Sequence, residues 1–585
     1  MTTSSGTRVH SRSPRTNSPR EGRPRAGRLV AALAGLTLVV AACGDIAGES
    51  SEPLDPAEAS QRLDELVDEI GWVDNQITRS ASIPPPTGAD LSDTLPDLDE
   101  FEIKVAAPPG AVEVVEIWAS TEKSGDGTDG WMTEVVTEFN NAGITLADGT
   151  PVGVDLRRIA SGTGFQYIAR GQELPDAFSP SNQLWIEMAG EFQTMTEVRP
   201  VTVENVAGIV MKNETADELR SAYGELTPEN LVDAVIAGDL VMGYTDPFAS
   251  STGLNFLLTV LDSIADGDES QLTSPDVASV FEQFQRQVPF VALTTLQMRD
   301  SVENDTGTLD TFVMEWQTFT NTDSLQSGFE FIPFGVRHDN PLYAVGDVDA
   351  AATEALESFA QFAEQPEYQQ RADEFGFDPA PFTPTVEVPS GATLIDVQNV
   401  WKDKKDGGRP VATVFVVDVS GSMEGTRIQA VREAMTSARE FIKPETQVGV
   451  VEFNDTAMKR LEVAEFDLNQ QGRYAAIAED LSPGGGTAMY DGIVLGLKML
   501  EDQRAADPDL KTLLVVLTDG ETTDGLQFDD VDDMIAGLRI PIYTVGFEAD
   551  LEELGRVSSL VEAASIDASE DDVEFKIAAL FNAGG

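Results

Sequence analysis

The sequence predicts an α/β protein built from two separate α/β units, and three observations lead to that prediction. At 585 residues with 41% hydrophobic content, the chain is long enough for several globular domains. Apolar runs of strand length repeatedly end in short Ser, Thr or Gly turns that precede helical patterns. Gly407-Gly408 and Pro410 then mark a boundary between two such series. Alternating strands and helices favour mostly parallel sheets with helices on both faces.

The charge of the chain excludes some classes of partner. The sequence holds 38 Lys and Arg residues against 101 Asp and Glu residues, a formal net charge of −63. Such a charge repels polyanions, so we expect neither nucleic acid nor an anionic membrane surface as a partner. The same charge keeps a protein soluble by self-repulsion and attracts divalent cations.

Residues 1–42 are predicted to be a secretion signal rather than folded structure. Seven arginines lie between Arg8 and Arg28, and the apolar run Leu29–Ala42 is too short to span a bilayer. The run ends in Val40-Ala41-Ala42-Cys43, which resembles the lipobox of bacterial lipoproteins. That resemblance implies cleavage before Cys43 and a diacylglycerol on its sulfur. The mature protein is then expected on the extracellular face of the cell membrane, held there by its lipid alone.

Residues 43–111 are predicted to form a lipid-anchored stalk with one short helix. Asp55-Pro56-Ala57-Glu58 is a favourable helix start, with Asp at the N-cap and Pro at the first helical position. Leu63, Leu66, Val67 and Ile70 follow at helical spacing. Pro84-Pro85-Pro86 and the acidic stretch after it favour a spacer.

Residues 112–379 are predicted to form an independent α/β unit. The strands expected at Val112–Trp118, Val152–Arg157 and Leu240–Thr245 each lead through Ser, Thr or Gly residues into a helix. Helix N-termini carry free N–H groups and a partial positive charge, so such turns bind polar or anionic ligands well. In open α/β sheets these turns lie at the carboxyl ends of the strands, where ligands sit.

This unit resembles bacterial extracellular solute-binding proteins with the type II periplasmic-binding fold, in particular over Gly243–Phe256 and Phe359–Pro379. The resemblance implies a bilobal unit whose lobes close on a ligand. It also implies a set of ligand-binding hydroxyl residues in the turns: Ser120, Thr121, Ser161, Ser181, Ser250, Ser251 and Thr252. Each of these residues taken alone is also an ordinary helix N-cap. Lobes that had lost the solute would instead offer a protein-binding surface.

Residues 380–409 are predicted to be a connector. Gly391–Lys405 favours a single helix with Leu394, Val397 and Val400 or Trp401 on one side, which we expect to pack on a neighbouring element.

Residues 410–585 are predicted to form a second, doubly wound α/β domain with a Rossmann-like sheet. Three oxygen-bearing side chains, Asp418, Ser420 and Ser422, alternate in the loop after its first strand. Thr487 follows a run of glycines, and Asp519 ends a later apolar strand. Because the carboxyl ends of central strands share one edge, a ligand site is expected there. Mg²⁺ prefers near-octahedral coordination by oxygen, which such residues supply.

The order Asp-x-Ser-x-Ser, then Thr, then Asp resembles the metal-ion-dependent adhesion site of von Willebrand factor A domains. The resemblance implies that one Mg²⁺, Mn²⁺ or Ca²⁺ ion is held by a set of five residues: Asp418, Ser420, Ser422, Thr487 and Asp519. It further implies that one coordination position receives an Asp or Glu side chain from a protein partner. The alternative is a Ser/Gly turn that only follows a core strand.

We expect no enzymatic activity. Of the two histidines, His10 lies in the signal, so only His338 remains, which argues against a His-based triad or a His-rich zinc site. Ser120-Thr121-Glu122-Lys123 matches the S-x-x-K motif of penicillin-binding enzymes, but no Ser-Asp-Asn or Lys-Thr-Gly partner motif accompanies it.

Two functions therefore stay open. One is a cell-surface lipoprotein that binds a protein partner through a divalent metal, with the middle unit as a ligand-binding or scaffolding domain. The other is the substrate-binding receptor of an ABC importer, with the C-terminal domain as a docking module.

Overall fold

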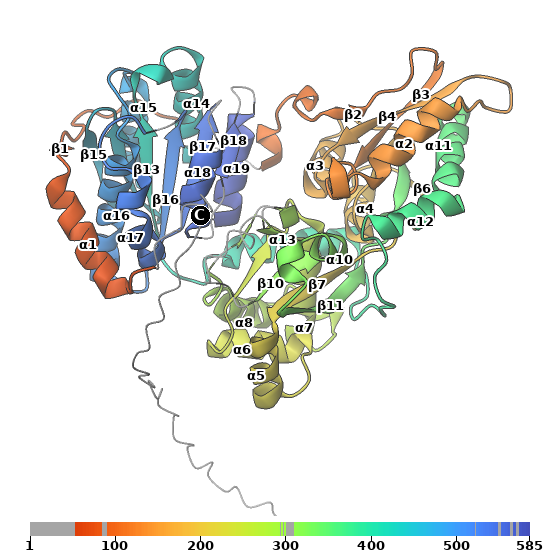
Figure 1. Cartoon of the computed structure of the whole chain (residues 1–585), viewed down its shortest axis with the longest axis horizontal. Helices are drawn as coiled ribbons and strands as arrows, with labels where there is room; N and C mark the ends of the chain where they lie inside the picture. Colours follow the sequence, from red (N-terminus) through yellow and green to blue (C-terminus); the bar gives the residue numbers. More distant parts are fainter. Residues whose placement is uncertain are drawn as a thin grey trace, which may run out of the picture. The chain divides into compact units, whose positions relative to one another are not determined.

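The computed structural model describes residues 53–84, 91–289, 291–292, 294–296, 298–299, 309, 311–520, 522–547, 551–561, 565–568 and 572–584. The expected signal and Cys43 lie outside these residues. Three sheets organise the described part of the chain (Figure 1). Within that part, no helix is both long and apolar enough to cross a membrane.

The C-terminal unit is built on a seven-stranded sheet with the order β1-β15-β14-β13-β16-β17-β18. Its strands are β1 (Val73–Asp74), β13 (Val411–Asp418), β14 (Gln447–Phe453), β15 (Ala457–Glu465), β16 (Lys511–Thr518), β17 (Ile542–Phe547) and β18 (Ser565–Ala568). Strands β14, β13, β16, β17 and β18 run parallel to one another, whereas β15 is antiparallel to β14. The mostly parallel, doubly wound sheet expected from the sequence is confirmed.

The helices of this unit cover both faces of its sheet, as Figure 1 shows. They are α14 (Thr426–Phe441), α15 (Leu468–Asp480), α16 (Met489–Ala506), α17 (Asp532–Leu538), α18 (Leu551–Ser559) and α19 (Val573–Gly584). Every residue of β13 is buried, as a central strand covered on both faces requires. Helix α16 packs closely on β13, because a Cβ at Gly496 would lie 2.8 Å from Val416 Cγ2. The N-terminus of α16 lies at the carboxyl edge of the sheet, because the N–H of its N-cap residue Ala488 donates to the carbonyl of Asn454, directly after β14, at 2.7 Å.

Residues 53–84 of the segment expected to be a stalk also belong to this unit, whereas its residues Ile103–Val105 pair in a sheet of the middle unit. Helix α1 (Pro56–Glu69) starts at the predicted N-cap, where the Asp55 carboxylate accepts hydrogen bonds from two backbone N–H groups. Leu63 and Leu66 are fully buried in the same apolar core as β13, and α1 lies along α16 and α17 (Figure 1). Strand β1 then extends the sheet beside β15. Residues 54–84 are therefore part of the folded domain, and the predicted stalk is wrong there, because the apolar stripe of α1 buries itself on the domain.

The middle unit has two sheets. The first has the order β2-β4-β3-β5-β12-β6, formed by β2 (Ile103–Val105), β3 (Glu113–Ala119), β4 (Val152–Arg158), β5 (Ala177–Ser179), β6 (Met195–Arg199) and β12 (Leu342–Val345). The second has the order β11-β7-β10-β8-β9, formed by β7 (Val206–Lys212), β8 (Met242–Thr245), β9 (Val291–Ala292), β10 (Thr311–Glu315) and β11 (Phe329–Arg337). The chain passes from the first sheet to the second after β6 and returns after β11, which confirms the expected two-lobed architecture.

Helices surround both lobes. They are α2 (Trp131–Ala142), α3 (Ser161–Arg170), α4 (Gln183–Gly190), α5 (Asn213–Tyr223), α6 (Pro228–Ala237), α7 (Ser251–Ile264), α8 (Pro275–Gln285), α10 (Trp316–Thr320), α11 (Ala350–Ala363) and α12 (Pro366–Glu374). The connector forms α13 (Gly391–Lys404), which packs against α4, α7 and α8. Its Leu394, Val397 and Trp401 are fully buried, so this helix packs on neighbours as expected.

Candidate metal centre

Asp418 is fixed at the end of β13 by hydrogen bonds to both carboxylate oxygens. The backbone N–H of Ser420 donates to Oδ1 at 2.7 Å, and the hydroxyl of Thr518 donates to Oδ2 at 2.6 Å. The residue is fully buried. Burial raises the pKa of Asp418, and the hydrogen bonds from Thr518 and Ser420 oppose that rise. The carboxylate is thus held in one orientation by the loop after β13 and by the last residue of β16.

A chain of hydroxyl contacts leads from this loop to Asp519 at the end of β16. Ser420 Oγ lies 2.9 Å from Ser422 Oγ, and Ser422 Oγ donates to Asp519 Oδ1 at 2.9 Å. The second oxygen, Asp519 Oδ2, lies 2.7 Å from Nη1 of Arg427. Side chains that are about a hundred residues apart in the sequence therefore meet at one edge of the sheet.

Thr487 lies in the glycine-rich loop next to this cluster. The two loops are joined by backbone hydrogen bonds, from Gly484 N–H to the carbonyl of Val419 at 2.9 Å and from Gly421 N–H to the carbonyl of Gly485 at 3.1 Å. Gly485 has a φ of +92°, a conformation that favours glycine. The structure thus brings four of the five predicted residues into one contact chain and places Thr487 in the adjoining loop.

The hydroxyl residues predicted to line a solute pocket also lie together, but they bond to protein groups. Ser120 Oγ and Ser181 Oγ both donate to Glu122 Oε1, and Lys123 Nζ donates to Ser120 Oγ. Lys123 also donates to the carbonyl of Ser179 at 2.8 Å and to Asn340 Oδ1 at 2.9 Å. Its side chain is fully buried, and burial lowers the pKa of Lys123 to about 8.

Four more of the predicted hydroxyl residues also form hydrogen bonds to other groups of the protein. Ser161 Oγ accepts from the Ser181 N–H, Ser251 Oγ accepts from Trp185 Nε1, and Thr252 Oγ1 donates to Glu315 Oε1. Ser250 caps α7 by accepting from the Gly253 N–H, as its N-cap alternative predicts. Thr121 is half-buried, and the other six residues are buried.

His338 completes this network of polar side chains between the lobes. Its Nδ1 lies 2.8 Å from Glu315 Oε1, and its Nε2 lies 3.1 Å from the side-chain nitrogens of Asn182 and Asn255. These three contacts hold the ring in one orientation among buried polar side chains. The residue is fully buried, so it packs in the interior.

Comparison with known proteins then places both units. Residues 413–575 match the family model of the von Willebrand factor type A domain, and residues 124–378 match the family described as bacterial extracellular solute-binding protein. The chain contains a solute-binding protein domain followed by a von Willebrand factor A domain. The matches together account for the two α/β units.

The curated relatives match about a quarter of this chain. Inter-alpha-trypsin inhibitor heavy chain H1 of Sus scrofa is 28% identical over 164 residues, which cover 26% of this chain and 17% of that protein. The H1 chain of Mesocricetus auratus is 31% identical over 149 residues, 24% of this chain and 16% of that one. This chain therefore spans less than a fifth of the length of these two relatives.

Among solved structures, a von Willebrand factor type A protein from Catenulispora acidiphila is 17% identical, covers 30% of this chain and 42% of its own, and has a TM-score of 0.27. The sulfate-binding protein SubI from Mycobacterium tuberculosis H37Rv is 15% identical and has a TM-score of 0.32. The match covers 49% of this chain and 91% of SubI.

The donor set at the edge of the A-domain sheet fits a hard divalent cation. It offers two carboxylates and three hydroxyl oxygens, the ligand type that Mg²⁺, Mn²⁺ and Ca²⁺ prefer, whereas zinc favours Cys and His. In the described part of the chain, no group of three or more His, Cys, Asp or Glu side chains is arranged to hold a metal. The proposed set is not such a group, because it contains only two carboxylates and its other three ligands are hydroxyls.

Sequence reasoning missed two residues of this centre. Thr518 precedes Asp519 directly, and its place at the end of an apolar strand was the available signal. Arg427 carried no signal that separates it from other basic residues of α14. In the solute-binding domain, Glu122 and Glu315 were missed as the acceptors around which the hydroxyls gather.

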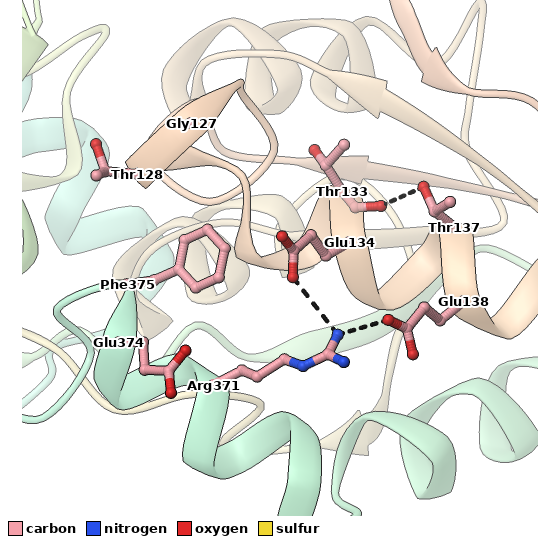
Figure 2. A pocket seen from close by; sticks show the side chains of 9 residues that line it. All are labelled: Gly127, Thr128, Thr133, Glu134, Thr137, Glu138, Arg371, Glu374 and Phe375. Carbon is pink, nitrogen blue, oxygen red and sulfur yellow. Dashed lines mark hydrogen bonds and ion pairs between the residues drawn. The ribbon is translucent and has the colours of Figure 1, made fainter.

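The solute-binding domain also has an open cavity of about 840 Å³ between α2 and α12, shown in Figure 2. Arg371 lies there between Glu134 and Glu138, with N–O distances of 3.5 and 2.6 Å. None of the predicted pocket hydroxyls lines this cavity. The cavity is therefore an ion-paired surface groove, separate from the network between the lobes.

Proposed function

We propose that this protein is a cell-surface binding lipoprotein whose A domain binds a protein partner through one divalent cation. The proposed ligands are Asp418, Ser420, Ser422, Thr487 and Asp519. The observation that supports this best is the contact chain from Asp418 through Ser420 and Ser422 to Asp519, at the carboxyl ends of β13 and β16. The A-domain family match over residues 413–575 supports it independently.

The protein groups would arrange the centre as follows. Thr518 and the Ser420 N–H orient the Asp418 carboxylate, so little reorganisation is needed when a cation is bound. When bound, the cation supplies a positive centre that a carboxylate of the partner ligates. The proposal is a binding protein rather than an enzyme, because both matched families are binding modules.

For the solute-binding domain we propose a scaffolding role. The buried network of Glu122, Lys123, Glu315 and His338 supports this role, because protein groups bond to one another where a solute would contact the hydroxyls of the turns. Across the lobes, the N–H of Gly162 donates to the carbonyl of Ala249 at 3.1 Å. A Cβ at position 162 would meet the carbonyl oxygen of Phe248 at 1.9 Å, so the lobes approach closely.

The importer receptor remains a second candidate, because residues 124–378 match the solute-binding family. If the protein is an importer receptor, its gene is expected beside permease and ATPase genes, and the two lobes of the domain are expected to close on a ligand. A scaffold requires neither the neighbouring transporter genes nor closure on a ligand.

For its location we propose the extracellular face of the cell membrane, with a diacylglycerol on Cys43. Replacement of Cys43 by Ala is expected to move the protein from the membrane fraction to the medium. Retention of that variant in the membrane fraction would exclude the anchor.

The partner is tested by a pull-down from cell-envelope extract with the wild type, with Asp418→Ala and with Asp68→Ala. Asp68 is exposed on α1 and is not one of the proposed ligands. Asp68→Ala therefore removes one carboxylate, as Asp418→Ala does, but leaves the proposed centre unchanged. We expect a partner that the wild type and Asp68→Ala retain, and that EDTA and Asp418→Ala release. A partner retained in EDTA would contradict the metal-dependent mechanism.

A further inference from the structure

A cavity of about 290 Å³ is lined by residues of α3, α13 and the short helix η1 (Leu91–Thr94). Arg170 holds η1 to α3, because its Nη1 donates to the backbone carbonyl of Ser92 at 3.2 Å. The described lining residues include neither the hydroxyl residues between the lobes nor the residues around the groove of Figure 2. This cavity is therefore distinct from the polar network between the lobes and from that groove.

The match to the solute-binding family does not account for this cavity. The family model matches residues 124–378. Part of the cavity wall lies outside that span, in η1 and in α13: Leu91, Ser92, Asp93, Ile395, Gln398 and Asn399. The segments before and after the matched domain thus complete the cavity, and the remaining wall comes from α3 and from two phenylalanines.

Aromatic rings form the apolar part of the cavity. Phe165 and Phe192 lie with their ring centroids 6.0 Å apart and their planes at 63°, and Phe248 also lines the cavity. Phe165 is buried, whereas Phe192 is 49% exposed. A flat ring bound beside Phe192 would remove apolar surface from water and would contact these rings in the tilted or offset geometry that aromatic pairs prefer.

Two buried glutamines form the polar part. Gln166 is 7% exposed, and its Oε1 is buried without a hydrogen-bond partner in the described part of the chain. Buried amide oxygens normally accept a hydrogen bond, so this one marks a place for a donor. Rotation about the last side-chain bond of Gln166 can turn the oxygen toward the cavity that the residue lines. Gln398 uses its Nε2 to donate to the carbonyl of Pro247 at 2.7 Å, so its oxygen remains as a second acceptor.

Charge and size limit the class of ligand. The charged residues of the described lining are Arg170 and Asp93, one of each sign, so the cavity selects neither a cation nor an anion. The net charge of −63 opposes an anionic ligand in addition. The volume of about 290 Å³ is near the lower end of the range for small-molecule pockets, and it is too small for a helix of a partner protein.

We propose that this cavity binds a small, uncharged, ring-bearing molecule that donates an N–H hydrogen bond to Gln166. The ring packs beside Phe192, and the N–H supplies the donor that Gln166 Oε1 lacks. The inference goes beyond the proposed function, since it uses no residue of the proposed metal centre.

The test uses the full chain, with indole as the probe and 1-methylindole as the matched probe that has no N–H. Equilibrium dialysis measures the affinity for each probe through the absorbance of the free molecule. The variants are Gln166→Leu, Phe192→Ala and the control Leu468→Ala. Leu468 is an apolar residue of α15 in the A domain and is 67% exposed, so Leu468→Ala also removes exposed apolar surface but lies outside the cavity.

We expect the wild type and Leu468→Ala to bind indole several-fold more tightly than 1-methylindole. Gln166→Leu should bind the two probes equally, because the acceptor is gone. Phe192→Ala should bind both probes several-fold more weakly than the wild type, and this arm stands even if Gln166→Leu does not fold, because Phe192 is exposed.

Three results would overturn the inference: no binding of indole to the wild type, equal affinity of the wild type for both probes, or wild-type affinity in Phe192→Ala. Equal affinity for both probes would identify a nonspecific apolar surface. None of these results would affect the proposed metal centre, which is tested by Mn²⁺ binding.

Discussion

Thr518 donates a 2.6 Å hydrogen bond to Asp418 Oδ2 across the paired ends of β13 and β16. The register of the two strands, with Val417 opposite Leu517, brings these side chains side by side. Both residues are fully buried, so water cannot replace the bond. The central carboxylate of the proposed centre is thus oriented by the sheet itself.

Loss of that bond should weaken the proposed metal centre. Thr518→Val keeps the shape of the side chain but leaves Asp418 Oδ2 without its donor. We expect the affinity for Mn²⁺ to fall roughly 10- to 100-fold, the usual effect of removing a group that orients a metal ligand. Calorimetric titration measures it, with Thr518→Ser as the variant that keeps the hydroxyl. Wild-type affinity in Thr518→Val would show that Asp418 needs no such support.

The helix before the solute-binding domain should contribute to the stability of the A domain. Leu63 on α1 is fully buried in the core that contains β13. Leu63→Ala is expected to lower the free energy of unfolding of this domain by about 2–5 kcal/mol, as truncation of a buried Leu does. Hydrogen exchange of α1 and α16 reports the change, and exposed Asp68→Ala should have no comparable effect. Equal protection in both variants would mean that α1 is not part of the domain.

Glu452 should make the A domain less stable as the pH rises. Burial raises the pKa of Glu452 from its ordinary value of 4.5 to about 7, although Arg460 Nη1 lies 3.2 Å from Oε2. Between these values the folded state binds more protons than the unfolded state, so stability falls as the pH increases. The loss approaches roughly 3 kcal/mol above pH 7.

The matched variant for this prediction is Glu452→Gln, which keeps a hydrogen-bonding side chain but does not titrate. Calorimetric unfolding at several pH values should show Glu452→Gln gaining stability relative to the wild type as the pH rises from 4.5 to 7. A difference that stays constant with pH would exclude the buried acid as its cause.

The network between the lobes should stabilise the solute-binding domain. Lys123 Nζ lies 3.8 Å from Glu122 Oε1, and both side chains are buried. Lys123→Met leaves Glu122 without its counter-charge, which we expect to cost about 3–5 kcal/mol. The double variant Lys123→Met, Glu122→Gln should recover part of that loss. Urea unfolding followed through the buried Trp118, Trp131 and Trp185 measures it. A single variant as stable as the wild type would remove the support for a scaffold held by internal charges.

The proximity of Asp418 and Asp519 could be predicted from the sequence, but the residues that surround them could not. Asp418 and Asp519 each follow a buried strand, and parallel strands bring their carboxyl ends to one edge, so their proximity follows from the pattern. Arg427 lies on a helix with other basic residues, and nothing in the pattern shows that it reaches Asp519. The apolar stripe on α1 was also visible in the sequence, but a stripe alone does not show which surface the helix packs against.

In the predicted solute pocket, the hydroxyl residues could be predicted from the sequence, but their hydrogen-bond partners could not. Its hydroxyls were found because turns after strands are rich in Ser and Thr. Their partners depend on contacts such as Lys123 with Asn340, which are 217 positions apart. Only the folded chain brings these two side chains together.

The most direct test of the account is the number of Mn²⁺ ions that the protein binds, measured by titration in about 0.15 M salt for the wild type, Asp418→Ala and Asp68→Ala. Weak binding of Mn²⁺ to the acidic surface is expected to be the same in all three proteins, so the comparison cancels that background. The account predicts that the wild type and Asp68→Ala bind one more Mn²⁺ ion tightly than Asp418→Ala does. Equal numbers in all three proteins would contradict it.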